Sequence, residues 1–483
     1  MPHSPSDTLD WAAHQREAME AYYAGAQPAH APMVGDDSGD PPQDQESPRP
    51  SGFAEWFALS QTVLPALLFL PGSQAFRLPV RIGAYGVSLY AFAVWWFGRG
   101  ARHQGRHPAE RWLLLVLLVV GLSILHPLTN SLTSGLAQTL LYFAIFCPLF
   151  WARSYVTTRR QLVRVVLLLL ICNGVNSIVG VLQVYDPERW MPKEFAAILT
   201  KNALAAATYV GPGGRLIVRP PGLFDTPGAV CSAGAIAALL GLILCLEDLA
   251  LWKRGIALSM AICGISAIYL SHVRVSLVVS IGTMFAYLLM LVTQRQTKRV
   301  AGFATLAAGL VAVGLLLATA LGGQTITDRF STLLAGDPRE LYYESRGKSV
   351  EYAFSSLLVD YPLGAGLARW GMMRHYFGDP SKLDSTELFA EVQPNAWILD
   401  GGIFLLTFYG IALIATAVYD LKLIWSLEDR TDRLWTSAVV AANFGTIALV
   451  FTFVPFGTAA GLQFWFLEGS LHGAMARRRR LTS

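Results

Sequence analysis

Long apolar stretches separated by short polar segments run from Phe53 to the C-terminal end of the sequence. The hydrocarbon core of a bilayer is about 30 Å thick, and a helix needs roughly 20 mostly apolar residues to cross it. The pattern predicts about twelve membrane-spanning helices, unless neighbouring short stretches merge or re-enter the membrane. The predicted helices cover residues 53–70, 78–97, 112–125, 132–151, 163–184, 223–246, 255–270, 275–292, 300–321, 396–419, 434–453 and 458–474.

The composition agrees with an all-α polytopic membrane protein. Hydrophobic residues make up 53% of the 483 positions and charged residues only 14%. This leaves too little polar surface to cover a soluble protein of that length.

The basic residues of the short loops predict the orientation, because Lys and Arg near span ends are retained on the cytoplasmic side. With twelve spans, all basic clusters fall on one face. They are Arg99, Arg102, Arg106 and Arg111; Arg153, Arg159, Arg160 and Arg164; Lys253 and Arg254; Arg295, Lys298 and Arg299; and the arginines at 477–480. We therefore expect a multi-pass protein of the bacterial inner membrane with both termini in the cytoplasm. Two long loops, 185–222 and 322–395, are expected in the periplasm.

The two ends of the chain differ from the apolar middle. Pro, Gly, Ser and Asp dominate residues 1–52, which predicts a disordered cytoplasmic tail without a cleavable signal peptide. Residues 53–474 are the predicted transmembrane domain, and 475–483 a basic cytoplasmic C-terminus.

The sequence indicates no metal, cofactor or nucleic-acid partner. All five cysteines lie in apolar stretches, where a thiol packs as a small hydrophobe, and none has a metal-site spacing with a histidine. The formal charge of +4 is explained by the basic loops of a membrane topology.

Four polar segments of the outer loops carry the candidate chemistry. Arg219 precedes Pro220-Pro221-Gly222 at the mouth of a span, and Arg274 follows Ser271-His272-Val273 between two spans. Arg346 opens an amphipathic stretch with Val350, Phe354, Leu357, Leu358 and Tyr361 on one face, typical of a helix lying on a membrane surface. The fourth segment runs from Gln393-Pro394-Asn395 to Asp400-Gly401-Gly402, leading into a span.

These segments, in this order, resemble the O-antigen ligase and polysaccharide polymerase (O-antigen ligase-related) membrane protein family over roughly residues 163–419. The resemblance implies a scaffold similar to the GT-C glycosyltransferases. It also implies periplasmic transfer of a glycan from an undecaprenyl diphosphate carrier to an acceptor hydroxyl, without nucleotide or metal. The implied partners are the lipid-linked oligosaccharide donor, a glycan or lipid acceptor, membrane lipid and other polysaccharide export proteins. By resemblance, Arg219, Arg274 and Arg346 are the matching arginines.

The sequence departs from the family beside Asn395, where family members commonly carry a histidine thought to assist the acceptor. Gln393 and Pro394 stand before Asn395 here. The available acid or base groups are His272, His375, Glu387, Glu391 and Asp400. Glu391 is our first choice because it lies just before Asn395 on the outer side, and Asp400 follows because it is close but deeper. Arg274, Arg346, Glu391 and Asp400 are thus the predicted catalytic residues, and Arg219, Asn395 and His272 the predicted substrate-binding residues.

Each assignment has an alternative. Arg219 is also suited to anchoring a loop to lipid headgroups, Arg274 to a structural ion pair, and Arg346 to a solvated helix start. Asp400 inside a span is equally suited to pairing with a neighbouring helix, and His272 to being an ordinary loop histidine. For the whole chain we favour a polymerase of exopolysaccharide or O-antigen repeats narrowly over a ligase of lipopolysaccharide biosynthesis. A secondary transporter of a small anion is the alternative from another class, and a structural partner in an envelope assembly is a third.

Overall fold

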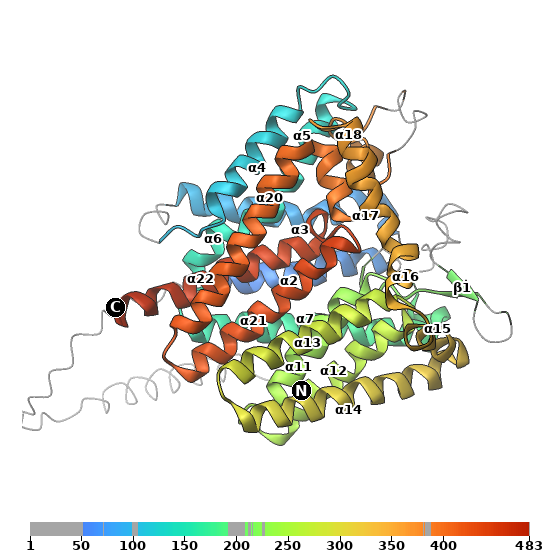
Figure 1. The fold of residues 1–483 in the computed structure, drawn as a ribbon, viewed down its shortest axis with the longest axis vertical. Helices are drawn as coiled ribbons and strands as arrows, with labels where there is room; N and C mark the ends of the chain where they lie inside the picture. Colours follow the sequence, from blue (N-terminus) through green and yellow to red (C-terminus); the bar gives the residue numbers. More distant parts are fainter. Residues whose placement is uncertain are drawn as a thin grey trace, which may run out of the picture. The chain divides into compact units, whose positions relative to one another are not determined.

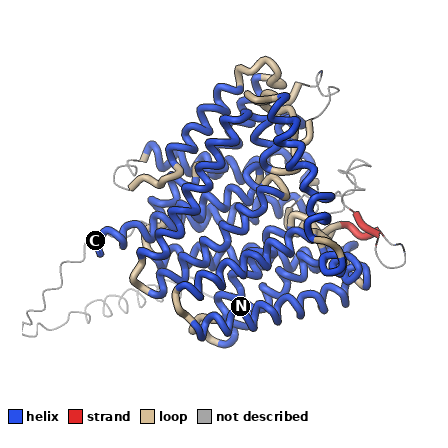
Figure 2. Tube along the Cα trace, viewed as in Figure 1, coloured by secondary structure: helices blue, strands red, loops and turns tan. Residues whose placement is uncertain are grey.

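The computed structural model describes residues 52–70, 72–98, 105–191, 208–210, 214, 216–224, 228–379, 381 and 388–482, all within the unit Arg49–Ser483. The predicted cytoplasmic tail lies outside these residues apart from Gly52. The described chain is helical apart from one antiparallel pair of three-residue strands, β1 (Thr208–Val210) and β2 (Leu216–Val218) (Figure 2).

The helices follow the apolar stretches of the sequence (Figure 1). They are α2 (Gly52–Ala66), α3 (Arg77–Phe97), α4 (Glu110–Ser123), α5 (Leu132–Phe146), α6 (Pro148–Tyr155), α7 (Arg159–Tyr185), α8 (Pro187–Trp190), α11 (Val230–Cys245), α12 (Leu251–Leu270), α13 (Arg274–Thr293), α14 (Thr297–Gly322), α15 (Gln324–Ala335), α16 (Pro338–Tyr342), α17 (Lys348–Tyr352), α18 (Leu358–Asp360), α19 (Gly371–Phe377), α20 (Gln393–Ser426), α21 (Arg430–Ala448) and α22 (Ala459–Thr482).

Nine of the twelve predicted spans are confirmed as helices long and apolar enough to cross a membrane. Within the described residues these are Gly52–Phe69, Arg77–Phe97, Leu132–Tyr155, Arg159–Tyr185, Leu251–Leu270, Arg274–Thr293, Thr297–Gly322, Gln393–Ser426 and Arg430–Phe451. The other three predicted spans are α4, α11 and α22. With 14 and 16 residues, α4 and α11 reach about 21 and 24 Å at 1.5 Å per residue, less than the bilayer core. The last, α22, carries Glu468, His472 and a basic end.

The loops that carry the basic residues meet at one end of the helical bundle, which we call the basic end. Arg159, the first residue of α7, lies 3.2 Å from Asp432 at the start of α21, and Arg299 of α14 lies 2.7 Å from Glu247 after α11. These ion pairs join loops that are far apart in sequence, as expected if the helices run antiparallel through one layer.

The long loops meet at the opposite end, which we call the loop end. The backbone N–H of Asn130, before α5, donates to the carbonyl of Leu367 at 3.1 Å. The hydroxyl of Tyr342 donates to the carbonyl of Phe451, after α21, at 3.0 Å. Figure 1 shows α16, α17 and α18 following one another along the bundle edge at this end. The predicted candidate segments therefore lie on one end of the molecule.

The predicted amphipathic stretch is helical but does not present one continuous apolar face. The helix from α16 to α18 contains two π-helical segments, η4 (Tyr343–Gly347) and η5 (Ala353–Leu357). Each π turn adds a residue to the turn and rotates the following side chains. Leu357 is buried against Ile398 of α20, whereas Phe354 is 46% exposed. Leu358 and Tyr361 pack against the same cluster as Leu357, so the predicted apolar face is kept in its second half and interrupted at Phe354.

Helix α20 is broken at Gly401 and Gly402, and the loop after α18 fills the break. Gly402 has a φ of +61°, and a Cβ there would overlap the carbonyl oxygen of Pro362. The backbone N–H of Ile403 donates to that carbonyl at 2.9 Å, and the N–H of Ala365 donates to the carbonyl of Leu399 at 2.7 Å. Irregular backbone inside a membrane protein is tolerated where its polar groups are paired within the protein. The 361–366 loop and the break at Gly401 and Gly402 are thus parts of one structural joint.

Candidate functional site

Two polar side chains of α7 hold the segment that carries Arg219 at the loop end. The side-chain amide of Gln183 donates to the carbonyl of Gly222 at 2.7 Å and accepts from its N–H at 2.9 Å. Asn176, two turns earlier, accepts the N–H of Leu223 at 2.7 Å. Gly222 has a φ of +67°, and a Cβ there would overlap the Asn176 side chain, so only glycine fits this turn. Two buried amides of a membrane helix therefore fix the segment that carries Arg219.

A tight turn between α12 and α13 places Arg274. His272 takes a φ of 58°, a left-handed conformation that is uncommon for a residue with a Cβ. The hydroxyl of Ser271 lies 2.8 Å from the thiol of Cys231 on α11, which fastens the turn to the neighbouring helix. Arg274 is the first residue of α13, so its guanidinium adds to the positive end of that helix dipole.

A fourth arginine, Arg329 of α15, joins the predicted ones. Burial lowers the pKa of Arg329, and the positive charges of Arg274 and Arg219 lower it further. Burial likewise lowers the pKa of Arg346, with Arg219 as the second cause. Arg329 therefore lies within electrostatic range of Arg274 and Arg219, and Arg346 lies within range of Arg219. We call Arg219, Arg274, Arg329 and Arg346 the arginine cluster.

His272 lies beside this cluster and is uncharged at neutral pH. Burial lowers its pKa to about 4, and the charges of Arg329 and Arg219 contribute. The local field therefore favours anions and disfavours a further cation. Consistent with a ligand position, the Nε of Arg219 is buried and meets no hydrogen-bond acceptor among the described residues.

Glu391 connects the arginine cluster to the start of α20. Its carboxylate forms an ion pair with the guanidinium of Arg346 and accepts a hydrogen bond from the hydroxyl of Ser349. Both partners of the ion pair remain about one-third exposed. Two predicted catalytic residues 45 positions apart are thus in direct contact, and a solvent-accessible carboxylate stands beside the cations.

Asn395 lies in the first turn of α20 and is buried. Its Oδ1 has no hydrogen-bond partner among the described residues, which leaves an acceptor available to a donor group of a substrate. The neighbouring Gln393 is already occupied, since its Oε1 accepts the backbone N–H of Phe456 at 2.8 Å. Gln393 therefore has a structural role, holding the start of α20 to the segment before α22.

Asp400 is placed differently from the other predicted residues. It is fully buried, and its carboxylate accepts hydrogen bonds from Tyr142 at 2.8 Å, Trp370 at 3.0 Å and Gln138 at 3.1 Å. A cavity of about 50 Å³ lies next to these donors, with Gln393 and Phe456 among its lining residues. None of the three donors belongs to the arginine cluster. Through these hydrogen bonds, Asp400 fixes α5 and the loop before α19 to the broken helix α20.

Of the remaining candidate bases, His375 lies on α19 and Glu387 lies outside the described residues. His375 is exposed on α19, where its ring lies edge-on to Tyr376. In the part of the chain that the structure describes, no three His, Cys, Asp or Glu side chains gather as they would around a metal ion.

Three residues of this site were not predicted from the sequence. Arg329 belongs to no recognisable motif, and only the fold of the 322–395 loop brings it to Arg274. Asn176 and Gln183 did leave a signal, because these two amides, seven residues apart, lie on one face of a largely apolar helix. Comparison with protein-family models gave no match to the chain, and comparison with curated proteins gave none either.

Proposed function

We propose that the chain is a glycosyltransferase of the bacterial inner membrane that transfers a glycan from a polyprenyl diphosphate to an acceptor hydroxyl. Polymerisation of oligosaccharide repeats is preferred narrowly over ligation. In this proposal the loop end faces the periplasm, both termini lie in the cytoplasm, and the helices form a GT-C-like scaffold.

The arginine cluster is the observation that carries the proposal. A diphosphate leaving group gains negative charge as the sugar–oxygen bond breaks, and guanidinium groups bind phosphate oxygens in a planar, two-pronged manner. Four such groups at one end of an apolar bundle suit a lipid diphosphate whose tail lies along the helices. Arg219, Arg274 and Arg346 are partly buried, which strengthens the interaction because the effective dielectric constant is lower there than in water.

Glu391 is the best-placed group to accept the proton of the acceptor. The acceptor oxygen attacks the anomeric carbon, the bond from that carbon to the diphosphate breaks, and the hydroxyl proton passes to the Glu391 carboxylate. Arg346 holds this carboxylate in an ion pair. A diphosphate that draws Arg346 towards itself would weaken the ion pair and leave Glu391 more basic at the moment of transfer.

Transport of a small anion is the alternative, and the break in α20 favours it. Broken helices line the binding sites of many secondary transporters. Here, however, the 361–366 loop fills the break and pairs the backbone groups that a substrate would otherwise contact. The arginine cluster serves either function, so the decision needs an experiment.

The deciding experiment has one genetic and one biochemical arm. After gene deletion, surface glycans on a gel should lose chain length but keep single repeats if the protein is a polymerase. Full-length chains left on the carrier would indicate a ligase. Purified protein should transfer glycan from a lipid-linked donor, and unchanged glycans together with no transfer would refute both forms of the proposal.

The location of the site has its own test. Reporter tags near Lys201 and Asp337 should respond as periplasmic, and tags near Arg102, Gln294 and Ser483 as cytoplasmic, because of the basic loops. A cytoplasmic response at Asp337 would place the arginine cluster on the wrong side for a periplasmic donor.

A further inference from the structure

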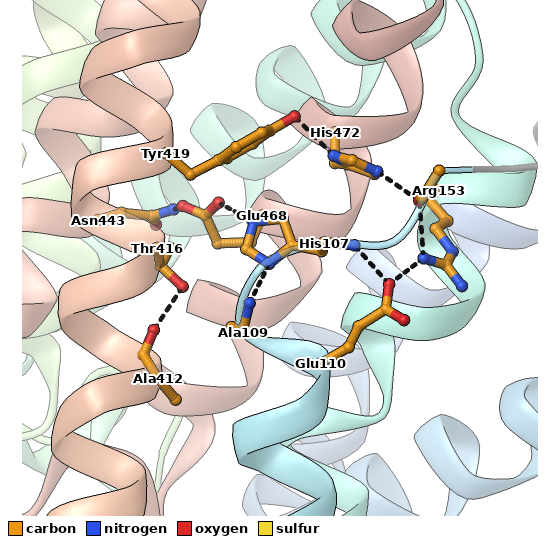
Figure 3. Close-up of polar contacts among 11 residues, drawn as sticks. His107, Ala109, Glu110, Arg153, Ala412, Thr416, Tyr419, Asn443, Glu468 and His472 are labelled. Carbon is orange, nitrogen blue, oxygen red and sulfur yellow. Dashed lines mark hydrogen bonds and ion pairs between the residues drawn. The ribbon is translucent and has the colours of Figure 1, made fainter.

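A second group of polar side chains is buried at the basic end, away from the arginine cluster. Figure 3 shows side chains from the loop before α4, from α6 and from helices α20, α21 and α22 meeting there. Glu110 forms an ion pair with Arg153 and also accepts the backbone N–H of His107 at 2.7 Å. The charge of Arg153 is thereby matched within the group.

Hydrogen bonds fix the tautomer of His472. Its Nε2 lies 2.9 Å from the carbonyl oxygen of Gly105, which can only accept, so this nitrogen carries the proton. Its Nδ1 then accepts the hydroxyl proton of Tyr419 at 2.6 Å. These contacts join α20 and α22 to each other and to the loop before α4 at the basic end.

The same argument applies to His107, which is completely enclosed. Its Nδ1 accepts the backbone N–H of Ala109 at 3.3 Å, so the neutral ring carries its proton on Nε2. Burial lowers the pKa of His107 well below the usual value, with His472 and Arg153 as further causes, so the ring is neutral. The Nε2 atom has no hydrogen-bond partner among the described residues and faces Oε2 of Glu468 at 3.9 Å (Figure 3).

Glu468 and Asp420 have too few hydrogen-bond donors around them, among the described residues, to stabilise two negative charges. Glu468 accepts a hydrogen bond from the amide of Asn443, but its second oxygen has no partner among the described residues. Asp420, on the same helix as Tyr419, is 1% exposed, and neither of its oxygens meets a donor in the described chain. The two carboxyl groups interact directly with each other.

Two adjacent buried carboxylates that are both ionised repel each other and lack bulk water or, among the described residues, a cation to stabilise them. A proton shared between them removes one of the two negative charges. We propose that Asp420 and Glu468 form a proton-binding site in which Asp420 holds one proton and donates it to the Glu468 carboxylate. The donor from Asn443 assigns the negative charge to Glu468, and Nε2 of His107 faces the second oxygen of that carboxylate. The other ionisable groups around the pair are Glu110, Arg153, Tyr419 and His472. This site does not depend on the proposed function of the loop end.

A hydrophobic carbodiimide tests the site in the unaltered protein. A protonated carboxyl group adds across the carbodiimide N=C bond with its proton passing to nitrogen, and the product rearranges to a stable acylurea. Mass spectrometry of the reconstituted protein should find this adduct on Asp420 at neutral pH and less of it as the pH is raised. No adduct on either Asp420 or Glu468 at any pH would overturn the proposal.

Infrared spectroscopy of the same membranes provides the second measurement. The carbonyl band of a protonated carboxylic acid should be present at neutral pH, disappear in Asp420→Asn and shift in Glu468→Gln. The control Asp432→Asn should keep the band, because that buried carboxylate pairs with Arg159 and lies outside the Asp420–Glu468 pair. A band unchanged in both test variants, or one that sodium ions abolish at constant pH, would overturn a proton site. If a variant fails to fold, the adduct on the unaltered chain decides.

Discussion

Replacing Arg346 by alanine separates the catalytic contribution of this residue from its contribution to stability. The ion pair with Glu391 is about one-third exposed on both sides, and exposed pairs contribute about 0–1 kcal/mol to the free energy of unfolding. The variant should therefore fold and reach the membrane. Loss of one group that stabilises a developing charge typically lowers turnover by about 10²–10³-fold, or about 2.7–4 kcal/mol. We expect a loss of this size in glycan transfer.

The assay is the rate of transfer from a lipid-linked donor by purified protein, with thermal unfolding followed on the same sample. Arg339→Ala is the matched control, because Arg339 lies in the same helical segment and is exposed. Arg346→Lys should recover little activity, since an ammonium group lacks the planar fork. Transfer by Arg346→Ala at the rate of the Arg339→Ala control would refute a role of the arginine cluster at the leaving group.

Three further predictions follow from the structure. Gln183→Leu leaves the buried N–H and C=O of Gly222 without their partners, at a cost of about 1–3 kcal/mol each, and should weaken donor binding, measured as a higher KM. Asn173→Leu is the control, because among the described residues the Asn173 amide bonds only within its own helix. Gly402→Ala should sharply lower the yield of folded protein on a sizing column, since its Cβ would overlap backbone, whereas Gly410→Ala in the same helix meets open space and should be tolerated. His272 has a folded-state pKa of about 4 against an ordinary 6.5, so the unfolded chain takes up its proton first and stability falls as the pH drops from about 6.5 towards 4. Replacement by Asn, which accepts the left-handed backbone, should flatten thermal unfolding temperatures across that range, and an unchanged acid sensitivity would contradict this cause.

The two inferred sites lie at opposite ends of the same helix. Asn395 stands in the first turn of α20 at the loop end, and Asp420 stands near its last turns at the basic end. The break at Gly401 and Gly402 separates them. If the carboxyl pair gains or loses its proton, the end of α20 that packs on α22 changes charge, while the joint at the break anchors the end that carries Asn395.

The sequence by itself determined that the chain is helical and where nine of its long apolar helices lie, because the length and apolarity of a span are local properties of the chain. It also selected Arg219, Arg274 and Arg346, since arginine beside a membrane span is uncommon enough to stand out. It missed the rotation of the 345–361 stretch, because two π turns changed the helical period without any mark in the residue pattern.

Only the tertiary structure decided which polar residues meet. Glu391 reaches Arg346 because the end of the 322–395 loop folds back on its own middle, while Asp400, nine residues after Glu391, turns into the bundle and is held by Gln138, Tyr142 and Trp370. The fold likewise decides which groups surround Arg329, His107, Asp420 and Glu468. The energy of a charged or hydrogen-bonding group depends on its burial and on partners supplied by distant segments, and neither is encoded in the neighbouring residues.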